Sequence, residues 1–226
     1  MKAHPLLAPL SLAAALALAA PAPAAQPPAS WDGLSRVAAK SIDALYLLPG
    51  ADFRTYAKVK LEPAEVAFRK NWVRDQNSTR RGLGGRISDA DARRALDAGA
   101  ASVDRIFAKA FAKAGYQMVD EAGADVLSIK PMVLNIAVAA PENMSAGRIH
   151  TFSVEAGQAT VVVEARDSLS HQLLGRAVDA QTIGDRGHGG IRNRASNVAD
   201  FEFAFADWAK RAAAGLARLR GSPPTP

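Results

Sequence analysis

The segment YAKVKLEPAEVAF, residues 56–68, decides the class of fold because its apolar and charged residues alternate. Ala57, Val59 and Leu61 fall on one face of an extended chain, and the other face carries mainly lysine and glutamate. This period of two predicts a strand with one face in the core and one face in water. Pro63 has no backbone N–H to donate, so it predicts a bulge or a sheet edge.

A helix is predicted after this strand, from Ser88 to about Ala114. Ser88 can cap the helix, and the acidic residues Asp89 and Asp91 fall in its first turn, where they satisfy exposed N–H groups. Gly115 is suited to end it. An apolar stripe follows the helical period: Leu96, Val103, Phe107, Ala110 and Ala114, with Ile106 and Phe111 beside it. The stretch RDQNSTRRGLGGR, residues 74–86, is rich in glycine and polar residues and predicts a loop.

Three further strands and a final helix are predicted. The strands lie in ADVLSIKPMVLNIAVAA (124–140), in one long run from Arg148 to Asp167, and in LLGRAVDAQTI (173–183). The helix buries Phe201, Phe205, Trp208, Ala212 and Leu219, with Asn197 as its expected cap. The order strand-helix-strand-strand-strand-helix predicts an α+β fold. It would have a mixed or antiparallel sheet of about four strands with two main helices packed on it.

The N-terminus has the pattern of a secretory signal peptide over residues 1–24. Lys2 precedes an uncharged run from Leu6 to Ala20, and Ala22 and Ala24 are the small residues of a cleavage site. We therefore expect a periplasmic protein with a proline- and alanine-rich leader over 25–40, a single α+β domain over 41–220 and a disordered tail over 221–226. No later run is long enough to span a membrane, so no transmembrane segment is expected in the mature chain.

Four blocks of the sequence, taken in order, resemble one known family. They are LLPGADFRTYAKVKLEPAEVAF (47–68), AGYQMVDEAGADVL (114–127), EAGQATVVVEARDSLSHQLLGRAVD (155–179) and NVADFEFAFADWA (197–209). They are similar to the domain of unknown function 3313, a family of Gram-negative envelope proteins and lipoproteins. The resemblance implies an exported protein of uncharacterised role and supplies no catalytic residues. The chain has no cysteine, so a lipid anchor is not expected here.

The motifs of common enzymes and cofactor proteins are missing from the sequence. GDRGHGGIRNR, residues 184–194, has neither the lysine and hydroxyl of a phosphate-binding loop nor the glycine spacing of a dinucleotide loop. His150, His171 and His188 lack the spacing of metal ligands. Glu164, Arg166 and Asp167 could form a site, but a surface ion pair across a strand is expected instead. We therefore expect no enzymatic activity, no cofactor and no metal, and an exported chain is not expected to bind nucleic acid.

Two loops rich in glycine and arginine suggest a binding surface. If the first strand runs parallel to the second and a meander follows, strands one, two and four point the same way, so the loops after them lie at one end of the sheet. The formal net charge is +6. Arginine suits carboxylates and phosphates. Seven arginines are expected there to bind an anionic partner, such as an envelope protein, peptidoglycan or an anionic lipid: Arg80, Arg81, Arg86, Arg148, Arg186, Arg192 and Arg194.

The sequence therefore favours a non-enzymatic accessory or adaptor protein of the cell envelope. An alternative is a periplasmic carrier of a small apolar or lipidic ligand, held between the sheet and the helices. The two readings differ in one structural respect, because a carrier needs an internal space between these layers and an adaptor does not.

Overall fold

The structure is a computed structural model that describes residues 27–79, 86–138, 151–153, 156–184, 190–192 and 194–221. The signal-peptide prediction, residues 1–24, lies outside these ranges. The described helices are α1 (Trp72–Thr79), α2 (Asp89–Lys113) and α3 (Arg194–Arg220), with a short 3-10 turn at Phe53–Thr55. The described strands are β1 (Ser30–Trp31), β2 (Leu34–Val37), β3 (Ala44–Leu47), β4 (Lys58–Leu61), β5 (Glu65–Phe68), β6 (Gln117–Met118), β7 (Val126–Val138), β8 (Thr151–Ser153), β9 (Gly157–Asp167), β10 (Leu173–Ile183) and β11 (Gly190–Arg192).

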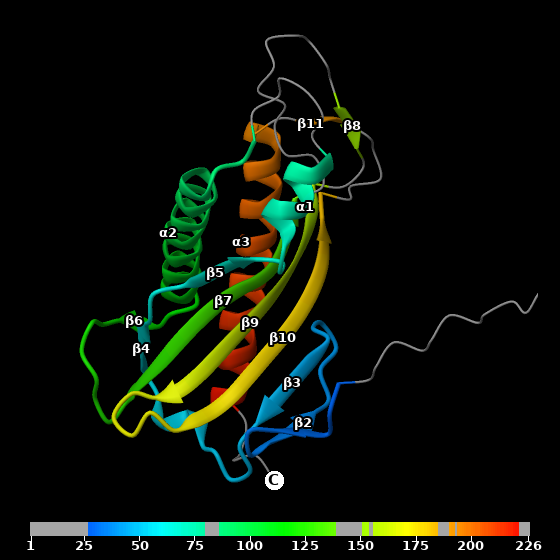
Figure 1. Cartoon of the computed structure of the whole chain (residues 1–226). Helices are drawn as coiled ribbons and strands as arrows, with labels where there is room; N and C mark the ends of the chain where they lie inside the picture. The colour runs from blue at the N-terminus through cyan, green and yellow to red at the C-terminus, as the bar shows by residue number, and fades with distance from the viewer. Residues whose placement is uncertain are drawn as a thin grey trace, which may run out of the picture.

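Among the described residues, nine strands form one mixed sheet in the order β1-β2-β3-β10-β9-β7-β4-β6, with β5 also paired to β7. The prediction of about four strands and two main helices is therefore wrong, although the α+β character fits. Strands β4 and β5 both pair parallel with β7, whereas β7, β9 and β10 form the expected antiparallel meander. Figure 1 shows the long strands β7, β9 and β10 at the centre of the sheet.

Pro63 is one reason for the higher strand count, because it divides the predicted first strand into β4 and β5. On one side of the break, the N–H of Glu62 donates to the carbonyl of Ile129 in β7, at 2.9 Å. On the other side, the N–H of Ala64 donates to the Asp104 carboxylate of α2, at 2.8 Å. Both N–H groups are thus satisfied while the chain bends.

The N-terminal segment adds three more strands. Strands β1 and β2 lie within the range 25–40 assigned above to a leader, and β2 pairs with β3 in an antiparallel hairpin. Strand β3 then pairs with β10, so residues 44–47 contact residues 175–178. The expected long strand 148–167 is described as β8 and β9, which belong to different sheets because β8 pairs with β11.

Helix α2 begins and ends as its sequence predicts. The Ser88 hydroxyl accepts a hydrogen bond from the Asp91 N–H at 3.1 Å, and the Asp91 carboxylate accepts from the Ser88 N–H at 3.3 Å, which makes a capping box. At the other end, Gly115 has φ +89, and the N–H of Tyr116 donates to the carbonyl of Phe111. This is the Schellman arrangement, in which the left-handed residue after the helix is usually glycine.

Two predictions about the other helices are wrong. Residues 72–79 form α1 rather than the start of a loop, and the ring of Trp72 stacks on Phe68 with centroids 4.4 Å apart. Helix α3 begins at Arg194, so Asn197 lies inside the helix and is not its cap.

Helices α2 and α3 lie side by side on one face of the sheet (Figure 1). Arg105 of α2 forms an ion pair with Glu202 of α3 at 2.7 Å. One continuous core joins these helices to the sheet, and its members include Val59, Val103, Phe107, Phe111, Leu127, Phe205 and Trp208. Within the described residues no helix combines the length and hydropathy needed to cross a membrane.

Candidate ligand-binding groove

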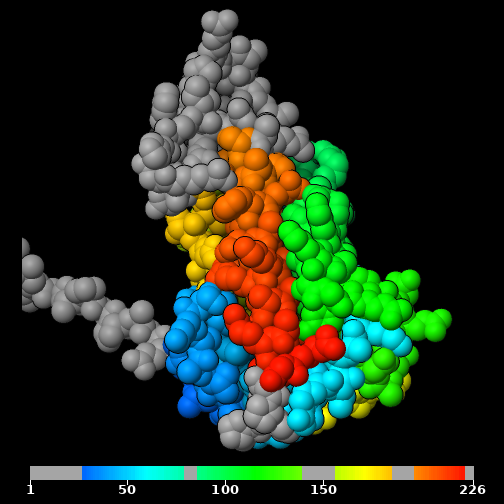
Figure 2. All heavy atoms as spheres, turned by 180° about the vertical axis from the view of Figure 1, so that it is seen from behind, coloured from blue at the N-terminus to red at the C-terminus, as the bar shows by residue number. Residues whose placement is uncertain are grey.

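A groove of about 580 Å³ lies between the C-terminal half of α3 and the helix-covered face of the sheet. One wall is formed by β3, β9 and β10, with Leu45, Val161 and Val163 among its side chains. The opposite wall runs along α3 from Trp208 to Leu219. Figure 2 shows the N-terminal strands, in blue, next to this half of α3, with α2 on the other side of the helix.

Small residues on both walls create the space. Gly175 and Ala177 come from β10, and Ala212 and Gly215 face them from α3. A Cβ atom added at Gly175 would lie 3.1 Å from Leu47, whereas one added at Gly215 would meet nothing nearer than Arg218, at 4.0 Å. Larger side chains at Ala177, Ala212 and Gly215 would bring helix and strand into the contact that fills a normal core, whereas the space beside Gly175 is already filled by Leu47 and Phe53.

A polar corner built around Asp179 closes one part of the groove. Asp179 is 6% exposed and lies on β10. Its carboxylate accepts hydrogen bonds from the indole of Trp208 at 2.8 Å, from Arg211 at 2.9 Å and from Gln181 at 2.8 Å. A buried carboxylate needs such partners, because an unpaired charge is costly away from water. Through these hydrogen bonds Asp179 joins strand β10 to helix α3.

The segment 38–42, between β2 and β3, forms the outer wall of the groove. Arg211 donates to the backbone carbonyl of Ser41, which ties this segment to α3. Asp43 ties it to β10 twice: its N–H donates to Asp179 at 3.2 Å, and its carboxylate accepts from the N–H of Ala180 at 2.9 Å. Ala38, Ala39, Lys40 and Ser41 are exposed. These hydrogen bonds hold the wall at its C-terminal end, at Ser41 and Asp43.

The chemistry of the groove is that of a binding site. Its lining is mainly aliphatic and aromatic, with polar groups confined to one corner and to the margin. Small-molecule sites have this composition, with a few polar groups that fix the orientation of the ligand. Among the described residues there is no cluster of three or more His, Cys, Asp or Glu that could hold a metal ion.

Glu164 and Arg166 form an ion pair at 2.7 Å on strand β9, as expected, but the pair is not at the surface, because Glu164 is 7% exposed. Glu164 also pairs with Arg176 at 2.7 Å, and Arg176 lies over the ring of Trp31 with 4.2 Å to its centroid. Burial disfavours the charged form of Glu164, but hydrogen bonds from Arg166 and Arg176 outweigh burial and lower the pKa of Glu164. These residues join β9, β10 and the N-terminal strands.

The strands that carry the predicted arginine loops end at one edge of the sheet. Strand β5 is parallel to β7, and β10 is antiparallel to β9, which is antiparallel to β7. Phe68, Val138 and Ile183 therefore mark the same end of the sheet, as expected. Of the seven arginines, Arg86 is described and exposed, and the backbones of Arg192 in β11 and Arg194 at the start of α3 are described. Arg80, Arg81, Arg148 and Arg186 lie outside the described residues, so their convergence stays a prediction.

The sequence offered a space between the sheet and the helices only as an alternative, and it did not identify the residues of the groove or its polar corner. Asp179 offered a signal, because it follows Gly175 and Ala177 on the inward face of a predicted strand, where a carboxylate needs partners. The small residues of AAAGLA, residues 212–217, were a second signal that this part of the last helix cannot fill a core. Trp208 was assigned to the core alone, although its indole N–H also requires an acceptor.

Comparison with known proteins gives one family and several distant structural likenesses. The family model described as "Protein of unknown function (DUF3313)" matches residues 26–212. No curated protein matches the sequence. The chain is similar to a PelC dodecamer from Paraburkholderia phytofirmans, at 12% identity and a TM-score of 0.35, with 74% of this chain and 94% of that chain covered.

Two other solved structures are similar to about the same degree. A DUF330 protein from Xanthomonas campestris has 14% identity and a TM-score of 0.37, with 76% of this chain and 88% of that chain covered. A DUF4136 protein from Bacteroides thetaiotaomicron has 10% identity and a TM-score of 0.35, with 84% of this chain and 98% of that chain covered. These TM-scores are too low to support an inference about the present chain.

Proposed function

Since the chain belongs to the DUF3313 family, whose description assigns no function, we propose a function from the groove: the protein is an exported envelope protein that binds a small apolar or lipidic molecule. The role is binding rather than catalysis. The observation that supports it is the groove of about 580 Å³ between α3 and the sheet. Binding sites for small molecules commonly measure about 300–1,000 Å³ and are mostly apolar.

The groove favours the carrier reading over the adaptor reading. An adaptor that binds its partner through loops does not need a space between its sheet and its helices. Here small residues on facing elements leave the space, and three hydrogen bonds hold the segment that forms its outer wall. The pattern of residues 1–24 supports an envelope location, where apolar ligands are abundant.

The test is to measure binding of apolar ligands to the purified protein and to a variant with a blocked groove. Native mass spectrometry after incubation with an envelope lipid extract should show a defined added mass. Gly215→Phe should abolish this mass, because the new ring projects into the groove where Gly215 leaves open space. Gly215→Ala is the matched control, because it changes the same position but leaves most of the volume.

Each outcome of this binding experiment either supports or overturns the proposal that the groove binds the ligand. Binding by the wild type and Gly215→Ala, but not by Gly215→Phe, supports the proposal. Equal binding by all three proteins places the ligand elsewhere and overturns it, provided that circular dichroism shows Gly215→Phe to be folded. No added mass in any protein also overturns it. A second blocking change from the opposite wall, Ala177→Phe, tests the same site if Gly215→Phe does not fold.

A further inference from the structure

The charged residues of the groove indicate which kind of molecule it holds, an inference that rests on the proposed function. Four cationic residues of the described chain line the groove: Lys40, Arg176, Arg211 and Arg218. Asp179 is the one carboxylate among the described lining residues. The question is which of these charges a ligand could meet.

Arg176 and Arg211 are already engaged by protein groups. The guanidinium of Arg176 binds Glu164 at 2.7 Å and Asp32 at 2.8 Å, in a cluster that also holds the ring of Trp31. Arg211 binds Asp179 at 2.9 Å, Asp207 at 3.0 Å and the carbonyl of Ser41. Each of these guanidinium groups thus faces two carboxylates of the chain itself.

Asp179 is equally satisfied by the protein. It accepts from Trp208, Arg211 and Gln181, and from the backbone N–H of Asp43. A cationic ligand would have to displace these donors to reach its charge, which would leave buried polar groups unpaired. The polar corner therefore joins α3 to β10 and offers no site for a positive head group.

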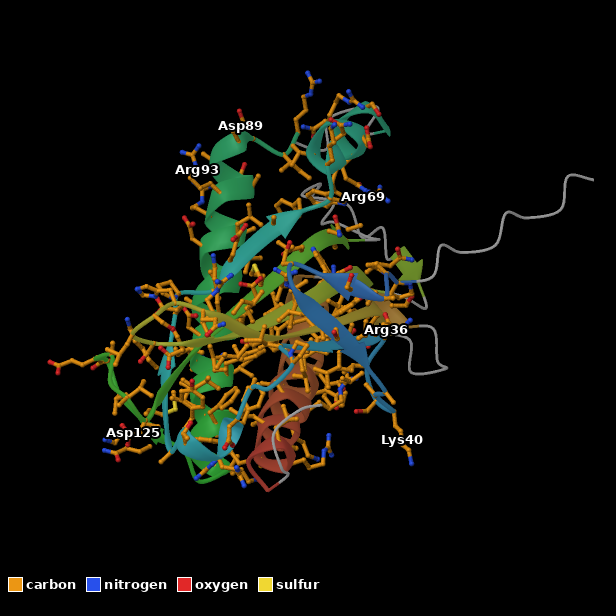
Figure 3. All side chains as sticks on the ribbon, turned by 90° about the horizontal axis from the view of Figure 1, so that it is seen from below. Arg36, Lys40, Arg69, Asp89, Arg93 and Asp125 are labelled. Atoms are coloured by element: carbon orange, nitrogen blue, oxygen red, sulfur yellow. The ribbon has the colours of Figure 1, made fainter. Side chains whose placement is uncertain are left out.

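Lys40 and Arg218 line the groove and, unlike Arg176 and Arg211, are exposed, so a head group in water can reach them whatever contacts they make within the protein. Lys40 belongs to the outer wall, and in Figure 3 its side chain points outward from the end of the N-terminal strands. Arg218 belongs to the last turn of α3. Long basic side chains can cover apolar surface with their stems while the charged ends stay in water. Such residues suit a ligand whose apolar part is buried and whose anionic end is at the surface.

We propose that the ligand is a single-chain amphiphile with an anionic head group. Its acyl chain packs between Leu45, Val161 and Val163 of the sheet and Leu216 of α3, and its head group lies at the margin with Lys40 and Arg218. The volume is that of one drug-sized ligand, which matches one acyl chain rather than the two chains of a phospholipid. Complementary charge at the margin selects the head group and leaves the apolar walls to supply the affinity.

The experiment uses three probes that share one chain length and differ in the head group. These are a long-chain fatty acid, the corresponding fatty alcohol and the corresponding alkyltrimethylammonium ion, each kept below the concentration at which micelles form. Isothermal titration calorimetry gives the dissociation constants. The acid should bind about tenfold more tightly than the alcohol, which corresponds to about 1.4 kcal/mol, and the cation should bind more weakly than the alcohol.

A double variant tests the residues. Lys40→Glu with Arg218→Glu should bring the affinity for the acid to or below that for the alcohol, because the new carboxylates repel the anionic head group, and should leave binding of the alcohol unchanged. The control is Lys70→Glu with Lys109→Glu, which changes the net charge equally at exposed positions outside the groove lining. This control separates a local contact from the general attraction of a basic protein for anions.

The outcomes distinguish the two proposals. If all three probes bind equally, or if the double variant binds the acid as wild type does, the head-group proposal is overturned while the groove proposal stands. If no probe binds, or if Gly215→Phe binds the probes as well as wild type does, the proposed function fails as well. Tightest binding of the cation would overturn the head-group proposal and require a different account of Asp179.

Discussion

The indole Nε1 of Trp208 donates a hydrogen bond of 2.8 Å to the carboxylate of Asp179, and this bond joins α3 to β10 at the edge of the groove. Both side chains are buried, with Trp208 2% and Asp179 6% exposed. The pair therefore holds the two walls of the groove at a fixed separation.

Removing the indole N–H should destabilise the protein more than an equal loss of ring size elsewhere. Trp208→Phe leaves the buried Asp179 without one donor, which should lower the free energy of unfolding by about 1–2 kcal/mol beyond the cost of the smaller ring. Trp72→Phe is the matched control, because Trp72 is also buried and its indole N–H has no hydrogen-bond partner among the described residues. Urea unfolding of both variants measures the difference, and equal losses would contradict the prediction.

The same substitution, glycine to alanine, should have opposite effects at two positions. A Cβ at Gly157 would lie 2.2 Å from the carbonyl oxygen of Ala137, where β9 pairs with β7. Gly157→Ala should therefore lower the free energy of unfolding by about 3 kcal/mol or more. Gly215 lies inside α3 with open space around its Cβ position, so Gly215→Ala should stabilise the protein by up to about 1 kcal/mol. Thermal unfolding of the two variants tests both signs. A stabilised Gly157→Ala variant would show that β7 and β9 are not this close.

Stability should fall at alkaline pH because of Tyr56. Burial, together with a hydrogen bond to Asp167 at 3.0 Å, raises the pKa of Tyr56 to about 12. The folded state therefore holds the phenol proton more tightly than the unfolded chain, in which the pKa is about 10. This contribution is complete below pH 10 and is lost as the pH rises from about 10 to about 12, and it amounts to roughly 2 kcal/mol.

The variant Tyr56→Phe isolates this effect from the titration of other groups. It has no phenol to ionise, so its stability should fall less than that of wild type between about pH 9 and pH 11. Urea unfolding at several pH values gives both curves. Parallel curves would show that the folded structure does not perturb the pKa of Tyr56.

The parts of the fold that sequence predicts are those set by neighbouring residues. Ser88 and Asp91 complete a capping box within one turn, and Gly115 ends α2 because it adopts a positive φ. The parallel pairing of β4 and β5 with β7 is the arrangement supposed for two strands joined through a helix. Each of these features depends on local chemistry or on a general rule.

The parts that sequence does not predict depend on residues far apart in the chain. Strand β3 reads ALYL without alternation, and its pairing with β10 joins positions about 130 residues apart. The groove likewise needs small residues from two elements, Ala177 of β10 and Gly215 of α3, in its lining. The run AAAGLA, residues 212–217, signals that this part of α3 cannot fill a core, but it does not show what lies opposite, so the space appears only when the layers are assembled.

The N-terminal segment should be removed during export. The protein recovered from the periplasm should begin at Ala25, because Ala22 and Ala24 are the small residues that signal peptidase requires. Ala24→Glu should block cleavage and leave the full-length chain attached to the inner membrane. N-terminal sequencing and cell fractionation test this. Full-length wild-type protein in the cytoplasmic fraction would contradict export.

The last prediction concerns the arginine-rich end of the sheet. Reversing the charge of a binding surface should remove the partner, whereas reversing the charge of a structural segment should lower the melting temperature. Strands β5, β7 and β10 end there together, so the loops that follow them start from one edge. Changing Arg186, Arg192 and Arg194 to Glu should abolish crosslinking to an anionic partner in the periplasm and leave the melting temperature unchanged. A matched triple variant of exposed cations elsewhere, Lys109, Lys113 and Lys210 to Glu, should keep the partner. If the first variant loses much of its stability, these arginines support the fold rather than bind, and if it keeps its partner, binding occurs at another surface.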